Sequence, residues 1–257
     1  MLDLLGYFLF VFAGLFFGLF GSGGSIIIIP VLVYIFQIPI YEATTYSLLI
    51  VFLVSVSGTL KHFRDQNFHI KKIIYFAVPA LLFTCLSRVF LFPAIPNNIV
   101  LLNMSKHTLL MLLFAIVILG CSLSLLRKPN IIHNYNLKTI LIFVGILVGV
   151  LSGLLGIGGG FIIVPTLILF ADMNIKESAS SALFLISINT FVAIILEITI
   201  FQFQFDFIFI ASLLLSGLTG LLLGIKLLNQ IDLNLVKKMF SFSLLLLSLI
   251  IFFIELI

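Results

Sequence analysis

Long apolar runs separated by short polar or glycine-rich breaks make up most of the chain. Most runs approach the roughly 20 residues that a helix needs to cross a bilayer, so the pattern predicts an all-α polytopic membrane protein. The expected elements, five in each half, are 4–20, 26–38, 44–60, 73–92 and 108–126, followed by 139–155, 161–171, 179–201, 207–228 and 235–257.

The second element of each half, 26–38 or 161–171, is too short to cross about 30 Å of hydrocarbon comfortably. Each one follows a glycine cluster, which predicts a broken or re-entrant helix. Irregular backbone at membrane depth is tolerated only where protein buries it or where it lines a cavity. We therefore expect both clusters to lie inside the protein or along a cavity.

The two halves resemble each other at an offset of 135 residues. The residues Gly14, Gly18, Gly21, Gly23, Gly24, Pro30 and Glu42 recur as Gly149, Gly153, Gly156, Gly158, Gly159, Pro165 and Glu177. Matching leucines and isoleucines mean little in so apolar a chain, so these residues carry the argument. We predict one transmembrane domain over 1–257, with repeat one at 1–126, a cytoplasmic linker at 127–138 and repeat two at 139–257.

The basic residues indicate how the chain is oriented, because loops rich in lysine and arginine stay in the cytoplasm. If each short element returns the chain to the side it came from, the basic loop residues fall on the cytoplasmic side, with Lys106 outside and Arg88 within a span. The bias nearly vanishes if each glycine break lies inside one continuous crossing. The first arrangement inverts repeat two relative to repeat one and predicts that both termini are extracytoplasmic.

The composition excludes a soluble domain, because 63% of residues are hydrophobic and 9% are charged, against roughly 25% charged in soluble proteins. Both cysteines, Cys85 and Cys121, lie in apolar runs and are given no chemistry. The four histidines show no ligand spacing, so we expect neither a metal site nor a cofactor. Nucleic-acid binding has no support in the sequence.

The paired glycine clusters, at 18–30 and 153–165, are the best candidates for a substrate site. Glycine permits positive φ and close backbone approach, so each cluster can end one helix and begin another. The new helix presents free N–H groups and a positive dipole end to an anion, near the midplane where the repeats meet. Ser25 is placed to cap its helix. The alternative is that the glycines only allow tight helix packing. The candidates are Gly21, Ser22, Gly23, Gly24, Ser25, Gly156, Gly158, Gly159 and Gly160.

Hydroxyl groups follow each cluster at the beginning of the third element. The candidates Thr44, Thr45, Ser180 and Ser181 either donate to a ligand or bond back to carbonyls of their own helix. Asn189, deeper in its span, is the best polar candidate of the second half, because a buried amide needs partners. Glu42 and Glu177 are interpreted as ordinary acidic helix starts.

Three ionisable residues within spans are functional candidates by default: Arg88, Glu197 and Lys226. Arg88 and Lys226 occupy related places late in the fourth elements, where we favour side chains that extend to the membrane interface. Glu197 is interpreted as an interfacial carboxylate, with a coupling proton as the alternative.

The duplicated Gly-Leu-x-Gly-x-Gly-Gly-x-x-x-x-x-Pro motif, with a small-polar helix start after each copy, resembles the TauE/SafE family of sulfite exporters, also called the domain-of-unknown-function 81 permeases. The resemblance implies an inner-membrane permease of sulfur metabolism that moves sulfite, sulfoacetate, thiosulfate or a related anion. Ser25 stands where the commoner motif has glycine, and the connection 93–105 lacks an equally long counterpart.

The leading prediction is alternating access around a small anion, with the lipid bilayer as the other partner. A cytoplasm that is negative favours export of one negative charge by about 2.3 kcal/mol per 100 mV, so export needs no coupling ion, although proton coupling is an alternative. An intramembrane enzyme acting on lipid or peptide would need a nucleophile with a base, or a metal cluster, and no such constellation is visible inside the spans. A non-transporting scaffold would leave the broken helices unexplained.

Overall fold

The computed structural model describes residues 2–21, 23–63, 70–99, 104–126, 137–156, 159–170, 173–228 and 230–256. Two of the predicted site residues, Ser22 and Gly158, lie outside these ranges. The described chain is helical apart from its connections and one short antiparallel hairpin, so the predicted all-α class is confirmed.

The helices follow the predicted order of five elements in each half. The first half contains α1 (Leu2–Phe20), α2 (Ser25–Pro30) continued by the π-helical turn η1 (Val31–Ile35), α3 (Ile40–Phe63), α4 (Ile70–Leu86) continued by the π-helical turn η2 (Ser87–Leu91) and α5 (Phe92–Ala94), strands β1 (Asn98–Ile99) and β2 (Met104–Ser105), and α6 (Lys106–Leu126). The second half contains α7 (Leu137–Leu155), α8 (Gly160–Phe170), α9 (Ile175–Thr199), α10 (Phe207–Leu228) and α11 (Leu233–Leu256).

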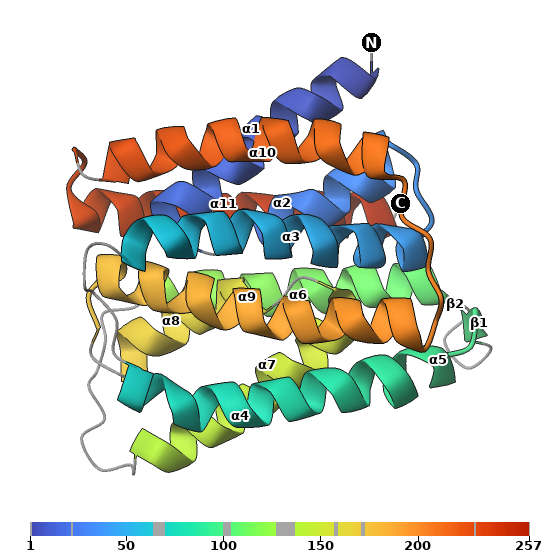
Figure 1. Cartoon of the computed structure of the whole chain (residues 1–257), viewed down its shortest axis with the longest axis horizontal. Helices are drawn as coiled ribbons and strands as arrows, with labels where there is room; N and C mark the ends of the chain where they lie inside the picture. Colours follow the sequence, from blue (N-terminus) through green and yellow to red (C-terminus); the bar gives the residue numbers. More distant parts are fainter. Residues whose placement is uncertain are drawn as a thin grey trace.

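Among the described residues, seven helices are long and apolar enough to cross a membrane, and the segments at 4–20 and 25–35 are shorter. The long helices run side by side in one bundle (Figure 1). Both termini lie toward the end of the bundle that carries β1 and β2 (Figure 1). The predicted placement of both termini on one side agrees with this arrangement, whereas the side itself stays a prediction.

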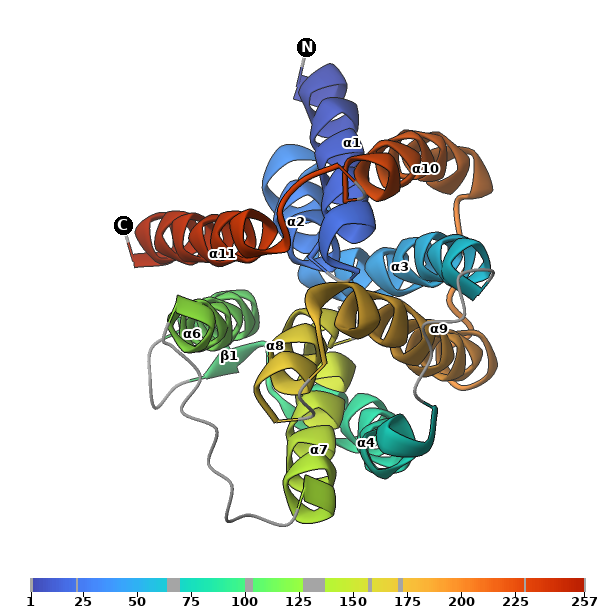
Figure 2. The same cartoon turned by 90° about the vertical axis from the view of Figure 1, so that its left-hand side faces the viewer.

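Four helix pairs organise the bundle: α1 packs on α10, α4 on α7, α3 on α9, and α6 on α11 (Figure 2). If the halves are exchanged, α1 takes the place of α7 and α10 that of α4, so the first pair becomes the second. The pairs α3–α9 and α6–α11 are unchanged, because each joins one helix to its counterpart in the other half. The helix contacts therefore repeat between the halves, as the sequence offset does, while the inverted relation of the repeats to the bilayer stays a prediction.

Close backbone contact holds the first of these pairs together. Gly14 and Gly18 of α1 have no side chain, so the backbone of α10 can approach them closely. Gly14 lies against the carbonyl of Gly217, and Gly18 lies against that of Leu221. In α7, the side-chain positions of Gly149 and Gly153 face the backbone of α4 in the same manner. A methyl group at any of these four glycines would overlap neighbouring backbone, as the helix-packing alternative requires for Gly18 and Gly153 of the clusters.

Candidate functional site

Both predicted helix breaks are present. Gly21 and Gly156 follow directly after α1 and α7, with φ of 72° and 67°. Each glycine N–H still donates to the carbonyl four residues earlier, at 2.9 Å to Phe17 and 2.8 Å to Ser152. A left-handed residue then ends the helix, which glycine does without a Cβ penalty. A continuous helix through either cluster is therefore excluded.

Each break packs against the beginning of the third helix of the other half. A Cβ on Gly21 would overlap the backbone of Ala179 in α9, and one on Gly156 would overlap that of Thr44 in α3. The two partners differ by the same 135 residues as the two glycines. Both breaks are buried in protein, as backbone at membrane depth requires.

The short helices begin after the breaks, with one departure from prediction. Gly159 has φ of 71°, and its carbonyl accepts hydrogen bonds from Ile162 and Ile163 in the first turns of α8. The cap of α2 is Gly24, which has no side-chain cap bond, so the prediction that Ser25 caps this helix is wrong. The helix begins one residue earlier than the motif suggested, and Ser25 is its first buried residue.

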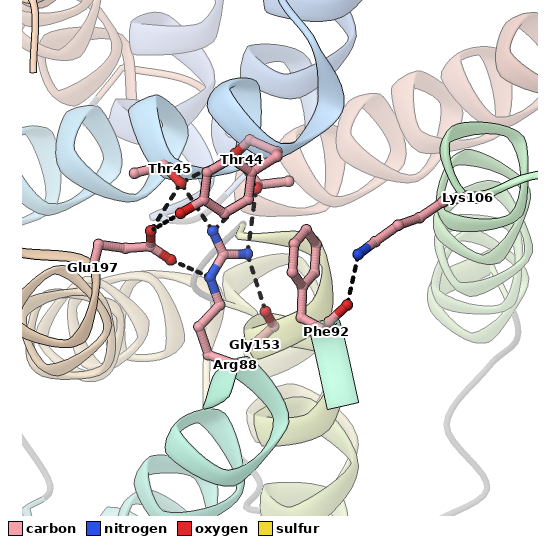
Figure 3. A network of polar contacts seen from close by, with 8 residues as sticks. Thr44, Thr45, Arg88, Phe92, Lys106, Gly153 and Glu197 are labelled. Carbon is pink, nitrogen blue, oxygen red and sulfur yellow. Dashed lines mark hydrogen bonds and ion pairs between the residues drawn. The ribbon is translucent and has the colours of Figure 1, made fainter. Parts of the chain in front are cut away.

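The structure assembles a charged cluster that the sequence did not predict. Arg88 on η2 and Glu197 on α9 have no exposed surface, and Arg88 Nε donates to Glu197 Oε1 (Figure 3). The interfacial interpretation of both residues is wrong, because η2 lies against α7 inside the bundle and turns Arg88 inward. Burial removes hydration from both charges, so each needs the other. Lys226 is exposed, and its place at the membrane interface stays a prediction.

Hydroxyl groups at the beginning of α3 complete the cluster (Figure 3). Arg88 Nη2 donates to Thr45 Oγ1 at 2.9 Å and to Thr44 Oγ1 at 3.2 Å. Arg88 Nη1 donates to Thr44 Oγ1 at 3.3 Å and to the carbonyl oxygen of Gly153 in α7 at 3.4 Å. Glu197 Oε2 accepts from the hydroxyls of Tyr41 and Thr45, each at 3.2 Å. Three elements, α3, α7 and α9, therefore converge on the guanidinium group that η2 carries beside the second break.

Two aromatic rings separate this cluster from a cavity at the hairpin end of the bundle. The guanidinium carbon of Arg88 lies 4.4 Å from the ring centroid of Phe92 and 5.7 Å from that of Tyr41. Beyond the Phe92 ring, Lys106 Nζ lies 3.9 Å from the same centroid (Figure 3). The cavity, of about 500 Å³, is lined by Pro39, Ile40, Tyr41, Phe92, Asn97, Ser105, Lys106 and His107. One cation therefore faces the cavity and a second lies just behind its aromatic wall.

The structure brings together only part of the predicted site. Thr44 and Thr45 contact Arg88, and Gly156 packs on Thr44. Ser180 Oγ donates to the carbonyl of Glu177 at 3.0 Å, which is the helix-internal alternative. Within the described chain, the partners of Arg88 do not include Gly21, Gly23, Gly24, Ser25, Gly159, Gly160, Ser180, Ser181 or Asn189.

Asn189 and the beginning of α9 serve other contacts. Asn189 Nδ2 donates to Ser152 Oγ at 2.8 Å, which ties α9 to the last turn of α7. Its Oδ1 and the hydroxyl of Ser181 are buried without a hydrogen-bond partner among the described residues. Glu177 and Asn174 form a capping box, which confirms Glu177 as an ordinary helix start.

Arg88 and Glu197 were both candidates in the sequence, but each was interpreted as interfacial and their pairing was not predicted. A usable signal was nevertheless present: two opposite charges lie within long apolar runs. Charges inside a membrane are rare and need partners, so an acid and a base in separate spans are candidates for a pair. Deciding between pairing and the interface required the packing of α4 on α7.

A bundle of membrane-length helices with two broken helices and a buried arginine defines a polytopic membrane protein of the transporter class. The profile of the family "Sulfite exporter TauE/SafE" matches residues 7–251, and the chain belongs to that family. The resemblance noted in the sequence is thereby confirmed.

Two curated proteins are similar to the chain over most of their length. A "probable membrane transporter protein" of Methanocaldococcus jannaschii is 27% identical over 189 residues, covering 70% of this chain and 67% of the relative. Another protein of that description, from Bacillus subtilis, is 28% identical over 178 residues, covering 67% and 69%. No solved structure matches significantly. The family and these relatives indicate a membrane transporter and not an enzyme.

Proposed function

We propose that the protein exports a small sulfur-containing anion, such as sulfite or a sulfonate, across the inner membrane by alternating access. The observation that carries the proposal is Arg88, a fully buried cation beside the second helix break. A charge at such a place is costly and commonly marks a substrate path. Membership of the sulfite exporter family supports the substrate class.

The chemistry of the cluster suits an oxyanion. A guanidinium group presents five N–H donors in a planar fork that binds two oxygens of one anion at once. Thr44 and Thr45 add hydroxyls at 3.2 and 2.9 Å from Arg88 Nη2. Sulfite and sulfonates each offer three oxygens to such a fork. Lys106, on the cavity side of Phe92, attracts the same anions to the outer end of the path.

The helix breaks are the second part of the proposal, separate from the direct partners of Arg88. Backbone N–H groups near Gly23, Gly24, Gly159 and Gly160 add positive dipole ends that favour an anion. Gly156 packs on Thr44, so movement of the second break changes the position of a group bonded to Arg88. Rearrangement of the breaks thereby alters access to the anion from either side.

Membrane potential sets the direction in this proposal. With both termini extracytoplasmic, the cavity at the hairpin end faces outward, because it shares that end of the bundle with them (Figure 1). A negative cytoplasm favours outward movement of one negative charge by about 2.3 kcal/mol per 100 mV. Uncoupled export is therefore sufficient, and coupling to a proton is the alternative form of the same proposal.

The direct test is flux of sulfite and methanesulfonate in proteoliposomes containing the wild type, Arg88→Lys or Lys226→Gln. Lysine keeps the charge of Arg88 but lacks its fork, so we expect flux to fall at least about tenfold. Lys226 is an exposed cation late in the corresponding helix, and its variant controls for loss of a basic residue. Wild-type flux by Arg88→Lys would overturn the proposed site. Wild-type flux by Gly24→Leu or Gly159→Leu would remove the glycine breaks from it.

A further inference from the structure

Glu197 already occupies the place that an anion would take. One carboxylate oxygen accepts from Arg88 Nε, and the other accepts from the hydroxyls of Tyr41 and Thr45 at 3.2 Å each. The side chain has no exposed surface. A carboxylate held by a guanidinium and two hydroxyls has the same contacts that a bound oxyanion would make. Substrate and Glu197 therefore compete for Arg88.

The charge balance decides how that competition ends. Arg88 and Glu197 together are neutral, so a monovalent anion added to the intact pair would leave one buried negative charge without a partner. Such a charge is strongly unfavourable even after relaxation of its surroundings. If Glu197 takes up a proton, the cluster with bound anion is again neutral. The exchange of an anion for the carboxylate therefore has its lowest free-energy cost when Glu197 takes up one proton.

Tyr41 is the side chain that links the cavity to Glu197. Tyr41 lines the outer cavity and donates its hydroxyl to Glu197 Oε2. Among the described residues, the titratable side chains that contact Glu197 are Arg88 from η2 and Tyr41 from α3. Lys106 and His107 lie farther out, along the cavity wall. A proton from water in the cavity therefore has one hydroxyl to pass before it reaches the carboxylate.

We propose that Glu197 is the resident anion of the Arg88 site and that substrate displaces it as its carboxylate takes up one proton. This inference rests on the proposed function, since it assumes that the anion binds at Arg88. An O–H bond forms on Glu197, its contact with Arg88 Nε is given up, and an oxygen of the substrate accepts that N–H instead. When the anion leaves, the proton is released and the ion pair closes again.

The test measures anion binding to the purified full-length protein over a range of pH. Methanesulfonate is the main probe, because its charge does not change over the range, and sulfite, sulfate and thiosulfate are compared with it. Where Glu197 is charged in the free protein and protonated in the complex, the dissociation constant should rise about tenfold per pH unit. Glu197→Gln is neutral at every pH and should bind with a flat profile.

The matched control is Glu255→Gln. Glu255 is a second largely buried carboxylate that accepts from a tyrosine, Tyr34, at 2.6 Å, but its other partner is His107 and not Arg88. This variant should keep the wild-type pH profile. Because Glu197→Gln leaves Arg88 without a counter-ion and can fail to fold, proton uptake by the wild type is measured as well. Addition of methanesulfonate to weakly buffered protein should remove about one proton per bound anion.

The outcomes separate the two proposals. A binding constant independent of pH, with no proton taken up, would overturn the role of Glu197, while loss of binding in Arg88→Lys would still support the site itself. Binding by Arg88→Lys equal to the wild type, or failure of the wild type to bind any of the four anions, would overturn the proposed function and this inference with it. A profile that flattens in Glu255→Gln as well would also count against Glu197.

Discussion

The two helix breaks have a similar backbone conformation but differ in the side chains around them. At the second break, Gly153 faces the backbone of Arg88, and at the first, Gly18 faces that of Ile225. Arg88 and Ile225 are therefore structural counterparts. The same comparison pairs Thr44, beside Gly156, with Ala179, beside Gly21. A cation and a hydroxyl in one half correspond to an isoleucine and an alanine in the other.

This difference shows which features the two halves have in common and which belong to one half. Breaks and close helix contacts recur because both halves must end a helix inside the bundle and pack it tightly. Among the described residues, the buried charged cluster lies beside the second break alone, and a second buried pair would bring a second desolvation cost. The backbone shape is thus shared by the two halves, whereas the buried charges lie beside the second break.

Removing the charge from the second break should have the largest effect. Arg88→Met copies the apolar character of Ile225 but leaves Glu197 buried without its cation, which typically costs about 3–5 kcal/mol of stability. We expect anion flux to fall to background and thermal unfolding to occur at clearly lower temperature. Flux in proteoliposomes and thermal unfolding of the purified protein measure the two effects separately.

The double variant Arg88→Met/Glu197→Leu distinguishes binding from folding. With both charges gone, no buried carboxylate lacks a partner, and replacing a buried ion pair by apolar residues is often neutral for stability. Stability should therefore recover while flux stays at background. Transport by this double variant would show that the charge at the second break is not needed for transport and that Arg88 has only a structural role.

The glycines of the two breaks should respond alike in stability but differently in binding. Both Gly21→Ala and Gly156→Ala force a left-handed φ on alanine, at roughly 1–2 kcal/mol, and overlap a neighbouring backbone. The added methyl at Gly156 meets Thr44, a partner of Arg88, whereas that at Gly21 meets Ala179. Anion affinity should fall in Gly156→Ala beyond what Gly21→Ala shows. Isothermal titration calorimetry with methanesulfonate, carried out on both variants, tests this difference.

The features common to both halves could be predicted from the sequence, whereas the charged cluster of the second break could not. The ten-element order and both breaks were predictable, because apolar run length and duplicated glycines depend on local geometry. Thr44 and Thr45, which contact Arg88, were among the candidates because they follow the break in sequence. The pair of Arg88 and Glu197 was not predicted, since its members come from different halves and their depth depends on how η2 lies against α7.

Loss of one hydroxyl should weaken binding without removing it. Thr44→Ala gives the second break the residue that Ala179 provides at the first, and it deletes an acceptor of Arg88. Hydrogen bonds to charged groups contribute about 1.5–3 kcal/mol, so affinity should fall by roughly tenfold or more. Thr190→Ala is the matched control, because this buried threonine bonds only to carbonyls of its own helix in the described structure. Equal affinity in the two variants would contradict the role of Thr44.

The smallest expected effect lies in the outer cavity. Lys106→Gln removes the cation on the far side of Phe92, so an anion approaching from the hairpin end meets less attraction, while Arg88 keeps its partners. Since such steering is screened by salt, we expect a few-fold lower rate from that side at low ionic strength and little difference at high ionic strength. Lys61→Gln, a cation in a cavity lined also by Lys226 and residues of α10, is the control. Asymmetry confined to Lys106→Gln would identify the cavity as the outer route to the charged break, and equal rates in both variants would exclude that route.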